Sequence, residues 1–515
     1  MSTKLTYTSG GLDPQIDADF ERHLEEARAR EGEALPQVIA GERLAAGPVR
    51  ERLDPTDTSR VATRYHEADA AMVERAVEAA KAAAKDWRRM PYEERCDLLQ
   101  RAAREIEGQI TEFAAVLSLE TGKTRVEALA EVQEGIDLID AYVGDVRDNK
   151  GYTKDLNSFT PGEHSVDVLA PYGVFGVVCP FNFPFALAIG MTVAALAAGN
   201  TVVMKPSEDA PLSGGQLAEV FEAAGLPTGV LNFVQGGAET GKALIQSAVD
   251  GIAFTGSAAV GATIANEMRS GSFSRPALME MGGKNPTIVA DSADLEAAAE
   301  GVARAAFGLS GQKCSACSRA IVVGDQGRVD RFTELLGEEA RRWSVGDPAD
   351  REAQLGPVIN QASVERFEKA AAEAKQDGDV VAGGARPDLP GYYVEPTVVA
   401  NLPIGHRLTR DELFLPFVAV TRVESLDQAI DEANDIDYGL TAGIFSDKED
   451  DVNEFLDRIE AGVTYVNRRA GSTTGAWPGA QTFCGWKASG STGKGGLGSY
   501  YVPQFMREQS RTYAS

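Results

Sequence analysis

Short apolar segments alternate with helical segments after Pro171, and this alternation constrains the fold more than any other feature of the chain. Strands are expected at Val174–Cys179, Thr201–Met204, Val230–Val234 and Ile252–Thr255, with helices near 186–198, 214–224 and 240–247. This order predicts a parallel sheet with helices on its faces. In such sheets the ligand crevice lies outside the carboxyl ends of the strands. We therefore expect a binding site there.

Polar and small residues directly follow three of these strands, at Pro180–Asn182, Lys205–Glu208 and Gly256–Ser257. The stretch Gly256–Gly261 lacks the G-x-G-x-x-G pattern, so by itself it indicates only a turn from strand to helix. Backbone N–H groups at the start of a helix nevertheless suit a pyrophosphate.

The chain has 515 residues. This is more than one hydrophobic core holds, so two or three domains are expected. A second α/β unit begins at about Pro286, with strands expected at Thr287–Ala290, Ala320–Val323 and Phe417–Thr421. Further along, residues 470–498 are rich in Gly, Ser and Thr, and we expect a loop that approaches a site closely.

The N-terminal part of the chain is mainly helical in pattern. Residues 1–50 are polar and charged, with a helical patch at Phe20–Ala29, and we expect an extension that precedes the first compact unit. Apolar residues recur at helical spacing from Ala70. Further helical stretches are predicted at Leu98–Phe113 and Val126–Tyr142.

The composition is strongly acidic, with 77 acidic and 50 basic residues and a net charge of −27. Such a surface repels nucleic acid and anionic membranes, so neither is expected as a partner. Adaptation to high salt and an ordinary acidic cytosolic enzyme both remain open. The first residues contain no basic stretch followed by an apolar core, and Phe185–Gly199 is too short to span a bilayer. We therefore expect a cytoplasmic protein.

Five cysteines and four histidines are scattered along the chain. The cysteines do not suggest a disulfide scaffold, and so few histidines offer little for a transition-metal site. No metal is expected.

Cys314 follows a polar, Gly-containing turn that can expose its side chain, and the adjacent Lys313 can favour the thiolate. A lone cysteine is more often a small buried hydrophobic residue. Cys314 and Cys317 also form a C-x-x-C pair, but a redox or metal role needs further ligands that are not evident.

Six short motifs then occur in a recognisable order. They are Pro180–Phe185, Lys205–Glu208, Phe254–Ser257 with Gly261, Glu280–Lys284, Gly311–Cys314 and Glu412–Phe414. Because these motifs occur in this order, the chain resembles the aldehyde dehydrogenase superfamily from about residue 50 to residue 510.

The resemblance implies covalent catalysis. Cys314 would be the nucleophile, forming a thiohemiacetal and then a thioester with an aldehyde. The Asn182 amide and the Cys314 backbone N–H would stabilise the oxyanion. Glu280 would be the general base that activates water.

The resemblance also implies NAD as cofactor. Lys205 and Glu208 would bind the hydroxyls of the adenosine ribose. Because a carboxylate at position 208 would repel the 2′-phosphate of NADP, NAD is favoured over NADP. The other implied cofactor-binding residues are Gly256 and Ser257 at the pyrophosphate, Glu412 and Phe414 at the nicotinamide end, and Pro180.

The implied fold is α/β, with a Rossmann-type cofactor domain, an α/β catalytic domain and a small β oligomerisation arm. The cofactor domain would comprise residues 1–149 and 169–281, and the catalytic domain residues 282–484. Residues 150–168 and 485–515 would form the arm and tail, with a projecting hairpin at Gly151–Asp167 that makes the protein a homo-oligomer.

Within the superfamily, the segment Gly311–Arg319 is most similar to the 1-pyrroline-5-carboxylate (L-glutamate γ-semialdehyde) dehydrogenases of proline catabolism. This resemblance implies that Ser315, Gly475 and Ala476 bind the substrate carboxylate and that Glu134 binds its ammonium group. The loop before Thr474 and the segment Gln481–Gly485 depart from that family's pattern.

Because these departures lie at the substrate mouth, another carboxylated or aliphatic aldehyde stays open as substrate. A catalytically silent member of the fold also stays open, although intact Cys314, Asn182 and Glu280 argue against it. A coenzyme A-acylating enzyme usually lacks the carboxylate at the position of Glu280.

Overall fold

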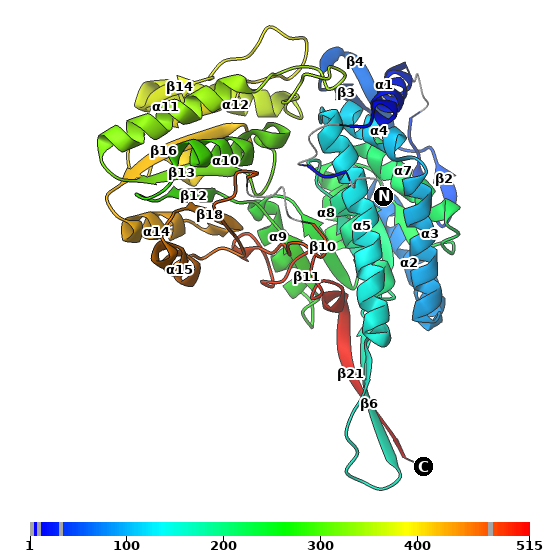
Figure 1. Ribbon diagram of the computed structural model, residues 1–515. Coiled ribbons are helices and arrows are strands. Elements are labelled where there is room, and N and C mark those ends of the chain that lie inside the picture. Colours follow the sequence, from blue (N-terminus) through cyan, green and yellow to red (C-terminus); the bar gives the residue numbers. More distant parts are fainter. Residues whose placement is uncertain (1–4, 8–11, 30–33, 472–476, 515) are drawn as a thin grey trace.

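The computed structural model describes residues 5–7, 12–29, 34–471 and 477–514. Two α/β units lie side by side, and a long β arm projects from the N-terminal one (Figure 1). The chain passes from the first sheet to the second between Glu280 and Asn285. The α/β class predicted from strand and helix alternation is therefore confirmed.

The first sheet has seven strands in the order β11-β10-β7-β8-β9-β1-β2. These are β11 (Ala277–Glu280), β10 (Gly251–Thr255), β7 (Val174–Val178), β8 (Thr201–Lys205), β9 (Leu231–Phe233), β1 (Gln37–Ile39) and β2 (Glu42–Leu44). The strands from β11 to β9 run parallel, whereas β1 and β2 are antiparallel additions at the edge. Every residue of β7, β8 and β10 is buried, as expected where helices cover both faces.

Helices surround this sheet on both sides. They are α1 (Pro14–Ala29), α2 (Ala70–Arg89), α3 (Tyr92–Glu107), α4 (Ile110–Thr121), α5 (Arg125–Asp148), α6 (Ala186–Ala197), α7 (Pro211–Ala223), α8 (Ala238–Gln246) and α9 (Ala258–Arg269). The helical stretch predicted at Leu98–Phe113 is in fact two helices, because α3 ends at Glu107, Gly108 caps it, and α4 begins at Ile110.

The described residues of the N-terminal region, which we expected to precede the first compact unit, pack against that unit. Phe20 and Leu24 of α1 are buried in the same core as α4 and α5. The strands β1 and β2 also extend the first sheet. Because the region is mostly polar, its few buried apolar residues gave no clear signal of packing in the sequence.

The second sheet also has seven strands, in the order β14-β15-β16-β13-β12-β18-β19. These are β14 (Asp379–Ala382), β15 (Thr397–Ala400), β16 (Phe417–Val423), β13 (Cys317–Val323), β12 (Asn285–Val289), β18 (Thr441–Phe445) and β19 (Val463–Val466). Only β14 at one edge is antiparallel to its neighbour. The associated helices are α10 (Leu295–Phe307), α11 (Gln326–Arg342), α12 (Gln361–Asp377), α13 (Arg407–Arg410), α14 (Leu426–Asn434) and α15 (Glu449–Arg458).

Three smaller sheets complete the fold. Two contain two antiparallel strands each, β3 (Val49–Asp54) with β4 (Asp57–His66) and β17 (Tyr438–Gly439) with β20 (Trp486–Lys487). The third is the arm, in which β6 (Glu163–Pro171) lies between β5 (Thr153–Asp155) and β21 (Met506–Ala514). Figure 1 shows that the arm extends away from both α/β units and carries the C-terminus.

The described part of the Gly-rich segment at 470–498 does approach other elements closely, as expected. Ser489 Oγ donates a hydrogen bond to the carbonyl of Gly282 at 2.6 Å. Met281 N–H donates to the carbonyl of Ser489 at 2.8 Å. This segment therefore packs against the residues that join the two sheets. Within the described residues, no helix is both long and apolar enough to cross a membrane.

Candidate active site

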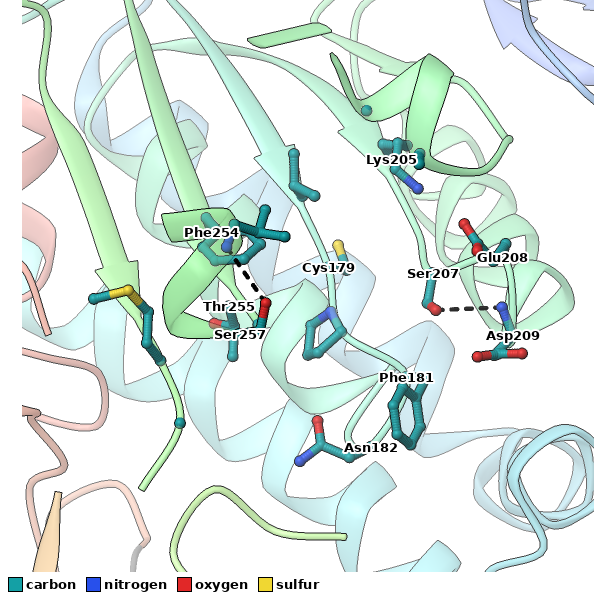
Figure 2. A pocket seen from close by; sticks show the side chains of 18 of the residues that line it. Cys179, Phe181, Asn182, Lys205, Ser207, Glu208, Asp209, Phe254, Thr255 and Ser257 are labelled. Carbon is teal, nitrogen blue, oxygen red and sulfur yellow. Dashed lines mark hydrogen bonds between the residues drawn. The ribbon is translucent and has the colours of Figure 1, made fainter. Parts of the chain in front are cut away.

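A cleft of about 770 Å³ runs along the carboxyl ends of β7, β8 and β10. All seven residues expected to bind the cofactor line it: Pro180, Lys205, Glu208, Gly256, Ser257, Glu412 and Phe414. Figure 2 shows Lys205 to Asp209 on one side, Phe254 to Ser257 on the other, and Cys179 to Asn182 between them. The cleft is therefore where the strand pattern predicts a ligand site.

Acidic residues gather at the Lys205 end of this cleft. Lys205 Nζ donates to the carbonyls of Pro206 at 2.8 Å and Gly236 at 2.7 Å, which fixes the ammonium beside Glu208. Burial raises the pKa of Glu208 and nearby Asp209 and Glu67 add to it, while Lys205 lowers it. A Cβ at Gly237 would lie 3.1 Å from Glu208 Oε2 and 3.5 Å from Glu67 Oε1. This end therefore suits hydroxyl groups better than a phosphate.

Ser257 caps the start of α9, where its Oγ accepts from Val260 N–H at 3.4 Å (Figure 2). The first N–H groups of a helix lack partners within the helix. A helix start exposed in a cleft can therefore receive an anionic group such as a pyrophosphate. Small residues at Gly256 and Ala258 leave room for its approach.

Glu412 lies at the other end of the cleft, close to the link between the two sheets. Its Oε1 accepts from Gly283 N–H at 2.9 Å, and burial raises its pKa to about 7. A Cβ at Gly282 would lie only 2.1 Å from Glu412 Oε2, so this close approach requires glycine. The neighbouring Phe414 packs edge-on against Phe181, with ring centroids 5.7 Å apart.

Cys314 follows a strained turn that is tied to its surroundings. Leu309 and Ser310 adopt left-handed φ angles of 54° and 52°, which are costly for residues with a side chain. Ser310 Oγ donates to the carbonyl of Gly356 at 2.7 Å. Asn285 Nδ2 donates to the carbonyl of Cys314 at 2.8 Å. These bonds hold the cysteine backbone at the floor of the cleft.

The surroundings of Cys314 oppose ionisation of its thiol. Burial raises its pKa to about 12, and the carboxylates of Glu412 and Glu280 add to the rise. The expectation that Lys313 favours the thiolate is therefore outweighed by burial. The half-buried Lys313 itself has a lowered pKa, again because of burial.

Glu280 ends β11 and lies beneath the Gly-rich C-terminal segment. Burial raises its pKa well above the usual range, although Gly485 N–H offsets part of the rise. Its Oε2 is buried and has no hydrogen-bond partner among the described residues. A Cβ at Gly495 would lie 2.2 Å from Glu280 Oε1. The unpartnered Oε2 atom is available to bind a water or a reacting group.

Asn182 lies in the loop between β7 and α6 and is 5% exposed. The loop ends where Glu131 Oε1 accepts from Phe185 N–H at 2.9 Å and from Ala186 N–H at 3.2 Å. Glu131 also forms a fully buried ion pair with Lys123. A carboxylate on α5 thus fixes the start of α6 and, through it, the loop that carries Asn182.

A second, smaller cavity of about 100 Å³ adjoins the cleft, and Cys314 lines both. Glu280, Ser315 and Glu134 line this second cavity, so the structure brings them together with Cys314. Asn182 lines the first cleft. Gly475 and Ala476 lie outside the described residues.

Aromatic side chains that were not predicted to belong to the site also line the second cavity. They are Tyr7, Tyr142, Phe183, Phe483 and Tyr501. Phe183 directly follows Asn182 and could have been inferred from that motif. The others come from distant parts of the chain and are typical of ordinary core residues.

Cys317, the second cysteine of the C-x-x-C pair, is buried at the start of β13. It accepts a hydrogen bond from Thr287 Oγ1 at 3.2 Å. All five cysteines are free thiols. Cys317 thus has the surroundings of a packed core residue.

A Rossmann-like cleft that meets a small cavity at one cysteine is the arrangement expected of a dehydrogenase that uses thiol chemistry. The profile described as "Aldehyde dehydrogenase family" matches residues 45–510, and the chain belongs to this family.

Several relatives share one name. A 1-pyrroline-5-carboxylate dehydrogenase from a Geobacillus species is 36% identical over 489 residues, 94% of this chain and 94% of that protein. A solved structure of 1-pyrroline-5-carboxylate dehydrogenase from Thermus with bound NAD has a TM-score of 0.93 and 34% identity, covering 98% of both chains. Proline utilization A from Bdellovibrio bacteriovorus has a TM-score of 0.91 and 35% identity, and this chain spans 52% of its length.

Proposed function

We propose that this aldehyde dehydrogenase oxidises L-glutamate γ-semialdehyde, the open form of 1-pyrroline-5-carboxylate, to L-glutamate with NAD in proline catabolism. The observation that carries the proposal is the position of Cys314 at the junction of two cavities. One cavity has the residues for a dinucleotide. The other offers Ser315 for a carboxylate and Glu134 for an ammonium group. The names of the relatives above support the same substrate.

The first half of the reaction takes place at the Cys314 sulfur. The Cys314 thiol first loses its proton to solvent. The resulting thiolate adds to the aldehyde carbon, and the carbonyl oxygen becomes the oxyanion of a thiohemiacetal. The Asn182 amide and the Cys314 N–H donate to this oxyanion, and one such donor contributes about 3–4 kcal/mol. When bound in the cleft, NAD supplies the acceptor for the hydride that leaves this carbon, and a thioester on Cys314 results.

Glu280 acts in the second half. Its carboxylate takes a proton from water as the water oxygen adds to the thioester carbon. The carbon–sulfur bond then breaks, which releases the carboxylic acid and returns the sulfur to Cys314. A raised pKa makes the Glu280 carboxylate a stronger base for this step.

The acidic end of the cleft supports NAD over NADP. Glu208, with Glu67 and Asp209 nearby, would repel a 2′-phosphate, whereas the Glu208 carboxylate can accept from ribose hydroxyls.

The experiment is a comparison of kcat/KM for L-glutamate γ-semialdehyde, succinate semialdehyde and propanal, each with NAD and with NADP. We expect the amino aldehyde with NAD to give the highest value. A higher value for propanal or succinate semialdehyde would reassign the substrate. A higher value with NADP would refute the role of Glu208.

We also propose that the arm joins copies of the chain in a cytoplasmic homo-oligomer. Large apolar side chains on the arm support this: Phe159 is 95% exposed and Tyr513 is 56% exposed. The free cysteines fit a reducing compartment. Light scattering of the full chain should give a multiple of the monomer mass, and the monomer mass alone would contradict the proposal.

A further inference from the structure

Tyr7 lies in the wall between two cavities. It belongs to the described stretch at residues 5–7. It lines the small cavity that contains Cys314 and Glu134. It also lines an outer cleft of about 980 Å³ whose walls include Arg125 and Lys313. Tyr7 is half-buried and therefore forms part of the barrier between the reactive cavity and the outside.

The Tyr7 side chain is held from several directions. Its hydroxyl donates to Glu134 Oε2 at 2.5 Å. Its ring meets Phe183 edge-on at 6.1 Å and Trp477 at 5.9 Å between centroids. The Lys313 ammonium lies 5.9 Å from its centroid. Contacts with four separate segments fix both the ring and the hydroxyl.

Glu134 needs such a partner because of where it lies. It is buried on α5, and nearby Glu131 and Asp137 oppose its ionisation, whereas Lys123 favours it. Burial raises the pKa of Glu134 to about 7, and the Tyr7 hydroxyl lowers it. A neutral hydroxyl stabilises a carboxylate without cancelling its charge, so the charge stays available to a second partner.

We propose that Tyr7 is a positioning residue for the substrate. Its hydroxyl holds Glu134 ionised and in one orientation, so that the carboxylate receives the ammonium group of an α-amino aldehyde. Its ring closes the cavity around that group. The inference rests on the proposed function, because it assigns Glu134 to the substrate ammonium.

The first test is Tyr7→Phe, which keeps the ring and removes the hydroxyl. Two substrates are compared: L-glutamate γ-semialdehyde and 5-oxopentanoate, which has the same carbon chain and carboxylate but no ammonium group. We expect KM for the amino aldehyde to rise by about tenfold or more, since a hydrogen bond to a charged group is lost. Its kcat and both constants for 5-oxopentanoate should stay nearly unchanged.

Tyr92→Phe is the matched control, because Tyr92, the half-buried first residue of α3, is also hydrogen-bonded to a glutamate, Glu93. It should leave both substrates unaffected. A double-mutant cycle with Glu134→Gln then tests whether Tyr7 acts through Glu134. On the Glu134→Gln background, Tyr7→Phe should produce no further rise in KM for the amino aldehyde.

The pH dependence gives a third readout that a merely structural role would not change. The ratio of kcat/KM for the amino aldehyde to kcat/KM for 5-oxopentanoate should increase as Glu134 ionises. Its midpoint should move to higher pH in Tyr7→Phe. The other charged groups that face Glu134 are Glu131, Asp137, Lys123 and Lys313, and none of them is altered by the substitution.

The outcomes separate the two claims. If Tyr7→Phe affects both substrates equally, or neither, the positioning role is overturned. If the double-mutant cycle is additive, Tyr7 does not act through Glu134. If the wild-type protein oxidises 5-oxopentanoate and not the amino aldehyde, the proposed substrate is wrong and the inference fails with it.

Discussion

Glu131 offers the sharpest link between a buried interaction and the active site. It forms a fully buried ion pair with Lys123 and accepts from the first N–H groups of α6, at Phe185 and Ala186. We consider two substitutions. Glu131→Gln removes the charge but keeps an oxygen acceptor, and Glu131→Ala removes both.

The structure sets the expected magnitudes. Lys123 and Glu131 are 1% and 0% exposed, so removing one charge leaves the other buried and unpaired. Breaking a pair of this kind costs about 3–5 kcal/mol. Glu131→Ala should cost about 0.5–2 kcal/mol more, because α6 also loses its cap. The double substitution Lys123→Met with Glu131→Gln should recover most of the loss, since no unpaired charge remains.

The assay is urea unfolding followed by circular dichroism, with kcat measured on the same samples. Glu131→Ala should lower kcat as well as stability, because the loop carrying Asn182 loses its anchor. The matched control is Glu222→Gln, which breaks a surface pair with Arg43 in which both side chains are about half exposed. That change should cost about 0–1 kcal/mol.

Equal stability of Glu131→Gln, Glu222→Gln and the wild-type protein would refute the reasoning. A double substitution that is as unstable as the sum of the two single ones would also refute it, because the loss would then not arise from an unpaired charge.

Three further predictions concern the reacting groups. Asn182→Ala should lower kcat by about 10²–10³ while leaving NAD affinity unchanged, as measured by steady-state kinetics and cofactor titration; an unchanged kcat would remove Asn182 from the oxyanion site. Gly495→Ala should lower kcat, because its Cβ would meet the Phe483 carbonyl at 2.0 Å and Glu280 Oε1 at 2.2 Å and would shift Glu280. Gly144→Ala is the control, because the space around Gly144 is open. Equal values of kcat for the two variants would contradict this prediction. Alkylation of Cys314 by iodoacetamide in the free enzyme should become about tenfold faster per pH unit from pH 7 upward, because burial raises the pKa of Cys314 to about 12. A rate that levels off near pH 7 would show that the pKa of Cys314 is lower.

The buried parallel strands could be predicted because each is a continuous apolar run between turn residues. The motif residues could be placed because they follow those strands directly. Cys314, Glu280 and the cofactor cleft thus required little beyond local pattern and the family resemblance.

Other parts of the site depend on contacts between residues far apart in the chain. Tyr7 and Glu134 are separated by 127 positions, and no local pattern indicates that they meet. From the sequence alone, Glu131 looks like a solvent-exposed carboxylate on a helix. Its contact with the start of α6 is seen only in the folded structure. Lys313 was expected to favour the thiolate, because sequence adjacency does not reveal how strongly burial opposes ionisation of Cys314.

The central claim is that catalysis proceeds through a covalent bond to Cys314. The most direct measurement is the turnover of Cys314→Ala with L-glutamate γ-semialdehyde and NAD, combined with cofactor titration to establish that the fold and the cleft are intact. We predict that NAD binds to the variant as it does to the wild-type protein and that no reduced cofactor is formed. Retained turnover in Cys314→Ala would contradict the account.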